Sequence, residues 1–412
     1  MINDTTCVIV GASLAGAKAT EALRAEGFDG PVVLIGAENE LPYERPPLSK
    51  GYLQGKAERE TIYVHPRQWY VDAAIDLRLG VAVTGIDRAA HEVMLADGSR
   101  VGYAKLLLTT GSSPRRLSVP GADLDGVRYL RTAADSDRIK AVLKEASRIA
   151  VIGAGWIGLE ITAAAREAGV QVTVLETAEL PLLRVLGREV GQVFAGLHRE
   201  HGVDLRFGVK VAEITGANGR VDGVRLADGS RIDADAVVVG VGITPNSQLA
   251  QAAGLDVDNG IRVDARLNTS DPDIYAAGDV ANAYHPLLGR HIRVEHWANA
   301  LNQPQAAAEA MVGREISYDR VPYFYTDQYD LGMEYSGYVD PDGYDEVIFR
   351  GDVDRREFVA FWLGAGGRVL AGMNVNIWDV TDAIQALVRA RKPVDTRALR
   401  DPATPLDSLT GG

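Results

Sequence analysis

Apolar runs and helical patterns alternate in the same order at two places in the first half of the chain. In each place an apolar run is followed by small and apolar residues at helical spacing, and then by a second apolar run. Strands that are apolar at every position suit a parallel sheet covered on both faces, so each set predicts a βαβ unit. The two sets are residues 5–11, 13–27 and 31–36, and residues 147–153, 154–169 and 170–176.

A repeated hairpin indicates that the two units belong to related domains. The sequence LADGSR occurs at residues 95–100 and again at 226–231, where Asp-Gly suits a tight turn. Each copy precedes an apolar run that ends in glycine, at residues 106–111 and 237–242. The glycine-rich turns of the two βαβ units begin 142 residues apart and the hairpins 131 residues apart, so we predict two domains of similar build.

The pattern changes from about residue 320 onward. Residues 344–352, 357–365 and 368–376 predict a short antiparallel sheet, and residues 380–392 predict a helix. The predicted fold is therefore α/β, with two Rossmann-like dinucleotide-binding domains and a small α+β carboxy-terminal domain.

Composition narrows the function classes. The formal net charge of −13, from 56 acidic and 43 basic residues, argues against binding to nucleic-acid backbones or anionic lipid. The amino terminus has no secretory signal pattern, and no apolar run approaches the ~18 residues that a membrane span needs. We expect a cytoplasmic protein with no nucleic-acid or membrane partner.

The chain has one cysteine, Cys7, which excludes an intramolecular disulfide, a CxxC redox pair and a cysteine-ligated cluster held by this chain alone. The seven histidines are scattered. The closest pair, His198 and His201, lies in the charged stretch LHREHG, which predicts a solvated helix surface rather than a metal site. We expect no metal.

The second glycine cluster has the full G-x-G-x-x-G spacing, with Gly153, Gly155 and Gly158 between a strand and a helix. The three glycines suit a tight turn, close backbone approach to a pyrophosphate, and helix-to-strand packing. Glu176, after the next strand, is placed to accept a hydrogen bond from a ribose 2′-hydroxyl and to repel a 2′-phosphate, which predicts NADH over NADPH. Arg184 could bind phosphate, but a surface or adenine-side contact is the favoured interpretation.

The first glycine cluster is imperfect. It has Gly11, Ser13 and Gly16, so a serine stands at the middle position, where the side chain is small enough to be tolerated. Glu38, 27 residues past Gly11, is the predicted ribose partner, although the usual spacing is about 20 residues.

A third motif, residues 269–281, is an apolar run that ends in Gly278 and Asp279 ahead of a helical stretch. Asp279 could present its carboxylate to a sugar-alcohol chain, or it could simply cap a strand-to-helix loop. Two dinucleotide sites in one chain indicate two different nucleotides, because nicotinamide delivers a hydride and a flavin can accept it and release single electrons.

Together, GASLAG, PYERPPLSK, LLLTTG, GAGWIGLE, VVVGVGITPN and IYAAGDVA resemble the FAD-dependent NADH:ferredoxin reductase family, of the putidaredoxin reductase and biphenyl dioxygenase ferredoxin reductase type. The resemblance covers essentially the whole chain. It implies a fold of the glutathione reductase kind, with a discontinuous FAD domain (residues 1–112 and 245–320), an NADH domain (113–244) and a carboxy-terminal domain (321–412).

The resemblance also implies roles for individual residues. Gly11, Ser13, Gly16 and Glu38 would hold the ADP half of FAD, and Asp279 its ribitol. The further residues expected on FAD are Arg45, Lys50, Thr110, Gly111, Gly278 and Trp297, and those expected on NADH are Gly153, Gly155, Gly158, Glu160, Glu176 and Arg184.

Lys50 and Glu160 are the expected catalytic residues, because in the family this lysine pairs with this glutamate near the reactive edge of the isoalloxazine. Sequence alone would favour an ordinary ion pair between a loop lysine and a helix glutamate. Residues 293–303 resemble the family segment whose helix points at the flavin pyrimidine, with Trp297 beside the ring or buried in the core. Relatives often have a tryptophan where Tyr325 stands.

The implied reaction is hydride transfer from NADH to FAD by positioning, followed by single-electron transfer. Without a redox dithiol, the electrons would leave to a [2Fe-2S] ferredoxin that serves a haem monooxygenase or a ring-hydroxylating dioxygenase. An NADH oxidase using oxygen and an NADH-sensing flavoprotein that binds a partner are the alternatives. Basic residues that could dock an acidic ferredoxin are Arg290, Arg293, Arg389, Arg391 and Lys392.

Overall fold

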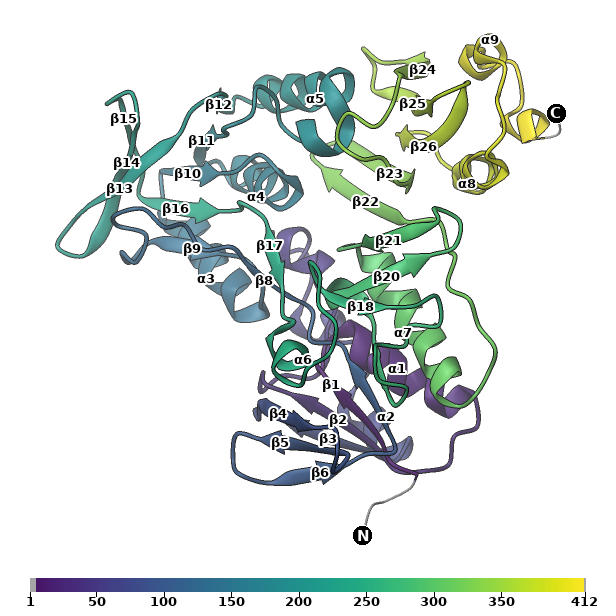
Figure 1. The fold of residues 1–412 in the computed structure, drawn as a ribbon. Helices are drawn as coiled ribbons and strands as arrows, with labels where there is room; N and C mark the ends of the chain where they lie inside the picture. The colour runs from purple at the N-terminus through teal and green to yellow at the C-terminus, as the bar shows by residue number, and fades with distance from the viewer. Residues whose placement is uncertain (1–4, 411–412) are drawn as a thin grey trace. The chain divides into compact units, whose positions relative to one another are not determined.

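The computed structural model describes residues 5–410, so the first residues of the amino-terminal stretch interpreted above lie outside it. The described chain forms two compact units (Figure 1). The first unit comprises the segments up to Arg45, Glu58–Ser113 and Ile243–Pro322. The second comprises Pro46–Ala57, Pro114–Gly242 and the segment from Tyr323 onward.

The first unit is built on a five-stranded parallel sheet. Its strands, in spatial order, are β19 (Ile274–Ala276), β7 (Lys105–Leu108), β1 (Cys7–Val10), β2 (Val32–Gly36) and β3 (Ile75–Leu79). Val8 lies between Val33 and Leu106 in the register, and all four residues of β1 are buried. Helices α1 (Leu14–Ala25) and α7 (Trp297–Met311) pack against each other beside this sheet (Figure 1).

Two small three-stranded sheets complete the first unit, one of β4 (Val83–Asp87), β5 (Glu92–Leu95) and β6 (Arg100–Gly102), the other of β18 (Ile261–Val263), β20 (Ala281–His285) and β21 (Arg290–Arg293). Strands β8 (Ser112–Pro114) and β17 (Ile243–Pro245) pair with each other. The short helices are η2 (Arg59–Ile62), α2 (Arg67–Asp72), α6 (Gln248–Ala252) and η3 (Gly278–Val280).

The second unit contains a parallel sheet in which four strands have the same chain order and spatial order as four strands of the first sheet. Its strands are β12 (Asp204–Arg206), β11 (Gln171–Leu175), β10 (Arg148–Ile152), β16 (Ala236–Val239) and β9 (Val127–Tyr129). The fifth strand differs, because β9 precedes the other four along the chain, whereas β19 follows them. Helix α4 (Trp156–Glu167) follows the central strand β10 as α1 follows β1. The predicted repeat of two Rossmann-like domains is therefore confirmed. Also present are η1 (Pro46–Ser49), α3 (Ala133–Glu145), α5 (Leu183–Glu200), β13 (Val211–Ala217), β14 (Arg220–Leu226) and β15 (Arg231–Asp233).

The two LADGSR segments form the same turn. Asp97 accepts hydrogen bonds from the backbone N–H and the hydroxyl of Ser99, and Asp228 does the same with Ser230. The glycine between the aspartate and the serine is Gly98 in the first copy, with φ of +86°, and Gly229 in the second, with φ of +87°. Because such a φ favours glycine, the shared Asp-Gly pair has a shared conformational cause.

The carboxy-terminal part of the second unit is a five-stranded antiparallel sheet with helix α8 (Thr381–Ala390) packed on it. Its strands, in order, are β22 (Tyr323–Gln328), β23 (Leu331–Gly337), β26 (Arg368–Val375), β25 (Glu357–Gly364) and β24 (Glu346–Asp352), and α9 (Thr396–Arg400) and η4 (Leu406–Thr410) follow. The last three strands and α8 were predicted, but β22 and β23 were not. In β22 the buried face consists of Phe324, Thr326 and Gln328, so apolar alternation fades after one residue.

The expectation of a helical stretch directly after Gly278 and Asp279 is wrong. These residues lie in the single 3-10 turn η3, and the chain then enters strand β20. The segment from Ala281 to His285 pairs on both sides, with β18 and β21, and is mostly buried, which favours strand over helix.

Cys7 lies in β1, is 2% exposed and forms no disulfide, and burial raises the pKa of its thiol to about 12. Within residues 5–410 no helix is long and apolar enough to cross a membrane. The same residues contain no group of three or more His, Cys, Asp or Glu side chains suited to a metal ion.

Candidate functional site

The first glycine of each cluster is required by the packing of the chain itself. Gly11 has φ of +119° and Gly153 has φ of +102°. A Cβ atom would lie 2.2 Å from the Thr109 carbonyl oxygen in the first case and 2.3 Å from the Gly240 carbonyl oxygen in the second. The turn therefore tolerates neither the conformation nor the volume of a larger residue.

The third glycine of each cluster sits at the first turn of its helix. A Cβ on Gly16 would lie 2.1 Å from the carbonyl oxygen of Gly11, and a Cβ on Gly158 would lie 2.1 Å from that of Gly153. Helix and turn thus approach too closely for a side chain, as the dinucleotide-binding motif requires.

The middle position differs between the two clusters. Gly155 has an ordinary φ of −82°, and no described atom lies within 4 Å of a Cβ built on it. Nothing in the described packing therefore requires glycine there, whereas close approach of a pyrophosphate would. Ser13 occupies the equivalent position before α1, and its side chain does not cap the helix. Both helix amino termini fit the phosphates of a dinucleotide.

A pair of alanine variants separates the two roles of glycine. Gly155→Ala should leave the thermal midpoint of unfolding nearly unchanged and weaken NADH binding roughly tenfold or more, because the new methyl group meets only the ligand. Gly153→Ala should lower the midpoint by several degrees, since it adds strain and a backbone clash. Calorimetry and NADH titration would check both, and unaltered NADH affinity in Gly155→Ala would contradict the role given to that position.

Glu176 is fixed against the second glycine cluster. One of its carboxylate oxygens, Oε2, accepts a hydrogen bond from the Ala154 N–H at 2.8 Å, and the other, Oε1, accepts from the Ala178 N–H at 2.9 Å and the Thr177 hydroxyl at 3.0 Å. The carboxylate is thus held by backbone beside the turn that would carry the pyrophosphate. Arg184 is exposed at the second position of α5.

Glu38 follows β2 and lies in a polar cluster of the first unit. It accepts a hydrogen bond from the Tyr43 hydroxyl at 2.6 Å, and Arg45 lies 3.4 Å away. Arg45 also donates to the Tyr43 hydroxyl at 3.3 Å. Tyrosine and arginine therefore orient the carboxylate predicted to bind the ribose.

Four more of the residues expected on FAD lie directly after β7 and β19. Thr110 donates through its hydroxyl to the Asn246 carbonyl at 2.8 Å, and the Asn246 amide donates back to the Thr110 carbonyl at 2.8 Å. Gly111 accepts from the Asn246 N–H at 2.9 Å. This reciprocal pairing fixes the loop that follows β7.

The segment after β19 is fixed in a similar way. Asp279 accepts a hydrogen bond from the buried Ser112 hydroxyl at 2.8 Å, and the Gly278 N–H donates to Gln303 of α7 at 2.8 Å. Trp297 is the first residue of α7 and is only partly buried.

Lys50 and Glu160 form an ion pair in the second unit. Lys50 Nζ lies 2.6 Å from Glu160 Oε1, with side chains 17% and 4% exposed, respectively. Two hydroxyls also donate to this carboxylate, Ser49 to Oε2 at 2.5 Å and Thr326 to Oε1 at 2.6 Å. The Lys50 ammonium lies 5.4 Å from the centre of the Tyr325 ring. The buried carboxylate of Glu160 therefore accepts hydrogen bonds from three side-chain donors.

Sequence reasoning missed Ser49 and Thr326. Ser49 stands directly before Lys50 in PPLSK, so its position offered a signal. Thr326 offered none, because its strand was not predicted.

The prediction that His198 lies on a solvated helix surface is wrong. Its side chain is 0% exposed, and Nε2 lies 2.8 Å from Gln328 Oε1. Burial lowers the pKa of His198 to about 4, so its imidazole is neutral at physiological pH. The apolar face of α5 packs into the second core cluster, and His198 falls on that face beside Leu197.

Arg293 is also not the docking residue that was expected. Its side chain is 8% exposed and pairs with Glu295 at 2.5 Å, so it is not presented to a protein partner. Arg290, Arg389, Arg391 and Lys392 are exposed.

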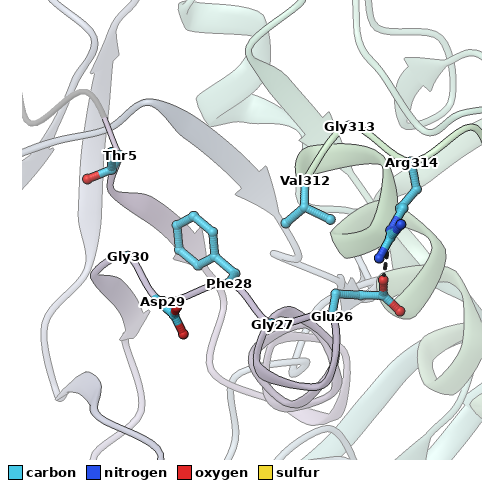
Figure 2. A pocket seen from close by; sticks show the side chains of 9 residues that line it. All are labelled: Thr5, Glu26, Gly27, Phe28, Asp29, Gly30, Val312, Gly313 and Arg314. Atoms are coloured by element: carbon cyan, nitrogen blue, oxygen red, sulfur yellow. Dashed lines mark hydrogen bonds and ion pairs between the residues drawn. The ribbon is translucent and has the colours of Figure 1, made fainter.

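A cavity of about 680 Å³ lies in the first unit, lined in part by Phe28 and Val312 and bordered by the Glu26–Arg314 ion pair at 3.1 Å (Figure 2). It adjoins the carboxyl ends of α1 and α7, opposite to the end of α1 that carries the glycine cluster. Helix carboxyl ends present carbonyl oxygens and repel phosphate, so this cavity does not suit a nucleotide.

These features define an oxidoreductase with two dinucleotide-binding folds. The chain belongs to the pyridine nucleotide-disulphide oxidoreductase family, whose sequence pattern matches residues 5–304. Residues 323–410 match the reductase C-terminal family. The ferredoxin–NAD(+) reductase component of the anthranilate 1,2-dioxygenase system of Burkholderia cepacia is 43% identical over 402 residues, covering 98% of each chain.

Two further comparisons agree with this assignment. Putidaredoxin reductase of Pseudomonas putida is 39% identical over 407 residues, covering 98% of this chain and 96% of that protein. The crystal structure of the covalent putidaredoxin reductase–putidaredoxin complex contains a chain with a TM-score of 0.94 and 39% identity, covering 98% of each chain. The recognition of the ferredoxin reductase family from sequence is thereby confirmed.

Proposed function

We propose that this chain is an FAD-dependent ferredoxin reductase that takes a hydride from NADH and passes electrons singly to a [2Fe-2S] ferredoxin. The ferredoxin would serve a haem monooxygenase or a ring-hydroxylating dioxygenase. The observation that carries the proposal is the repeated sheet, glycine turn and helix in two units whose only cysteine is buried. Two nucleotide folds without an accessible thiol favour an external electron acceptor over a disulfide.

The chain's own residues supply binding and orientation. In the first unit, the turn at Gly11 and the carboxylates of Glu38 and Asp279 would hold FAD. In the second unit, the turn at Gly153 and the carboxylate of Glu176 would hold NADH. When bound, FAD would supply the two-electron to one-electron conversion that no side chain provides.

Lys50 and Glu160 would orient the nicotinamide. Their ion pair is buried, so its charges stay in fixed positions and are weakly screened by water. The reaction needs no proton transfer to a side chain in the hydride step, and correct placement of the reactants supplies the rate.

The deciding experiment measures NADH consumption by the purified flavoprotein in air, with and without a [2Fe-2S] ferredoxin coupled to cytochrome c. Strong stimulation by the ferredoxin is expected. Turnover sustained by oxygen alone, with no stimulation from a diverse ferredoxin panel, would support an NADH oxidase instead. Slow reduction with neither acceptor active would support an NADH-sensing protein.

Basic residues at the end of α8 are proposed to dock the acidic ferredoxin. Replacing Arg389, Arg391 and Lys392 together by Glu should lower kcat/KM for ferredoxin roughly tenfold at low salt, because it reverses a local positive charge. Flavin reduction by NADH should not change. The control variant is Arg355→Glu, on the turn between β24 and β25, which should leave kcat/KM for ferredoxin unchanged. Ferredoxin reduction by the unaltered protein that does not depend on salt would count against docking by charge.

We further propose that the protein works in the cytoplasm, where NADH is produced, and that its domains are an FAD domain (residues 1–112 and 245–320), an NADH domain (113–244) and a carboxy-terminal domain (321–412). Cell fractionation with immunodetection tests the location. Binding of NADH, and of ADP as a fragment of FAD, to variants of Glu176 and Glu38 tests the assignment of the two nucleotides.

A further inference from the structure

Behind Glu160 lies a buried chain of hydrogen bonds that crosses from β22 to α5. Thr326 Oγ1 lies 2.6 Å from Glu160 Oε1, and Gln328 Nε2 lies 3.3 Å from Thr326 Oγ1. The amide oxygen of Gln328 lies 2.8 Å from Nε2 of His198. The other ring nitrogen of His198, Nδ1, lies 3.3 Å from the Tyr329 hydroxyl. We call the four residues Thr326, Gln328, His198 and Tyr329 the donor chain.

The positions of the donor chain follow from local structure. Thr326 and Gln328 are two residues apart on β22, so their side chains share one face of the sheet. That face is buried, since Thr326 and Gln328 are each 1% exposed. His198, on the buried face of α5, meets Gln328 from the opposite side. A buried polar side chain is costly unless its donors and acceptors are hydrogen-bonded, so each residue of the series needs a partner on either side.

The carboxylate of Glu160 determines the direction of every bond in the chain. An ionised carboxylate can only accept, so the Thr326 hydroxyl must donate its proton to Glu160. The Thr326 oxygen then accepts from the Gln328 amide group, which leaves the amide oxygen of Gln328 as an acceptor. His198 must therefore carry its proton on Nε2.

The far end of the chain is consistent with this direction. Neutral His198 with its proton on Nε2 has a bare Nδ1, which accepts from the Tyr329 hydroxyl. Burial raises the pKa of Tyr329, so the hydroxyl keeps the proton that it donates. The Tyr329 ring is held by stacking on His201, with ring centroids 3.6 Å apart.

We infer that the donor chain positions Glu160 by donating hydrogen bonds toward its carboxylate, so that the tautomer of His198 reports the direction in which the chain donates. The inference rests on the proposed role of Glu160 in orienting NADH. It assigns Thr326, Gln328 and His198 as positioning residues, which act through Glu160 and not by touching the nucleotide. Two other charged groups act on this carboxylate: Lys50 forms the ion pair with it, and Asp327 interacts with it electrostatically.

The first test is the tautomer of His198, measured by NMR on the flavin-containing protein labelled with ¹⁵N at histidine, with His198→Asn used to assign the signal. The expected result at neutral pH is a proton on Nε2 and none on Nδ1. A proton on Nδ1 would overturn the inference, because the chain would then run in the opposite direction. The measurement uses no electron acceptor, so it stands apart from the proposed ferredoxin reaction.

The second test compares Thr326→Val with Thr326→Ser. Valine matches the shape of threonine but cannot donate, so flavin reduction by NADH should slow roughly tenfold, as expected for loss of a hydrogen bond to a charged group. Serine keeps the hydroxyl and should restore the rate to within about twofold. The valine variant should also lose the single tautomer of His198. Equal reduction rates in valine and serine variants, together with an unchanged tautomer, would show that Thr326 only fills space.

Discussion

Replacing Glu160 by Ala is expected to slow reduction of the flavin by NADH on the order of 100-fold. The substitution removes the acceptor of three donors, Ser49, Lys50 and Thr326, and leaves a largely buried ammonium without its partner. Loss of one partner of a buried ion pair costs about 3–5 kcal/mol, so the stability of the second unit should also fall. Anaerobic rapid mixing, following the absorbance of oxidised flavin, measures the rate.

Two further variants separate catalysis from stability. Glu160→Gln keeps the shape and one acceptor oxygen and should show a smaller loss, roughly tenfold. Glu167→Ala, on the same helix, removes an exposed partner of Lys56 at 3.1 Å and should leave the rate unchanged. Reduction kinetics of Glu160→Ala equal to those of the unaltered protein would remove the proposed role.

A preference for NADH over NADPH of about 100-fold in kcat/KM is expected from Glu176. Its carboxylate is fixed by the Ala154 and Ala178 N–H groups, so it cannot swing away from a 2′-phosphate placed at the same turn. Glu176→Gln keeps an oxygen that can accept from Ala154 but removes the charge. It should reduce the preference about tenfold, mainly by improving the efficiency with NADPH.

The matched control for Glu176 is Glu179→Gln. Glu179 is exposed a few residues further along the same loop and pairs with Arg188 on the surface. Its replacement should not alter the ratio of the two efficiencies. Equal efficiency of the unaltered protein with NADH and NADPH would refute the argument from Glu176 directly.

Much of the fold could be predicted from the sequence because its strands follow simple rules. β1 and β10 are apolar at nearly every position, as parallel strands covered on both faces are, and glycines with positive φ mark the turns after them. The repeat of LADGSR also predicted the hairpin after each βαβ unit. Strand β22 could not be predicted, because two of its three buried side chains are polar.

Only those residues of the candidate site that belong to a local sequence motif could be predicted. The glycine turns and the acidic residues after β2 and β11 follow from spacing along the chain. The partners of Glu160 come from segments more than 100 residues away, and hydrogen bonds over such separations leave no periodic signal. His198 shows the same limit, since a charged stretch such as LHREHG gives no sign that one histidine faces a buried glutamine.

The single thiol, on Cys7, can report when the first unit opens. Cys7 sits in the middle strand of the first unit's parallel sheet, paired to Val32 on one side and Lys105 on the other. A thiol-modifying reagent can reach it only after that sheet opens, because the sulfur is buried and its pKa is raised to about 12. The rate at which a reagent labels Cys7 therefore measures how often the parallel sheet of the first unit opens. The chain thus carries its own probe of local unfolding in that unit.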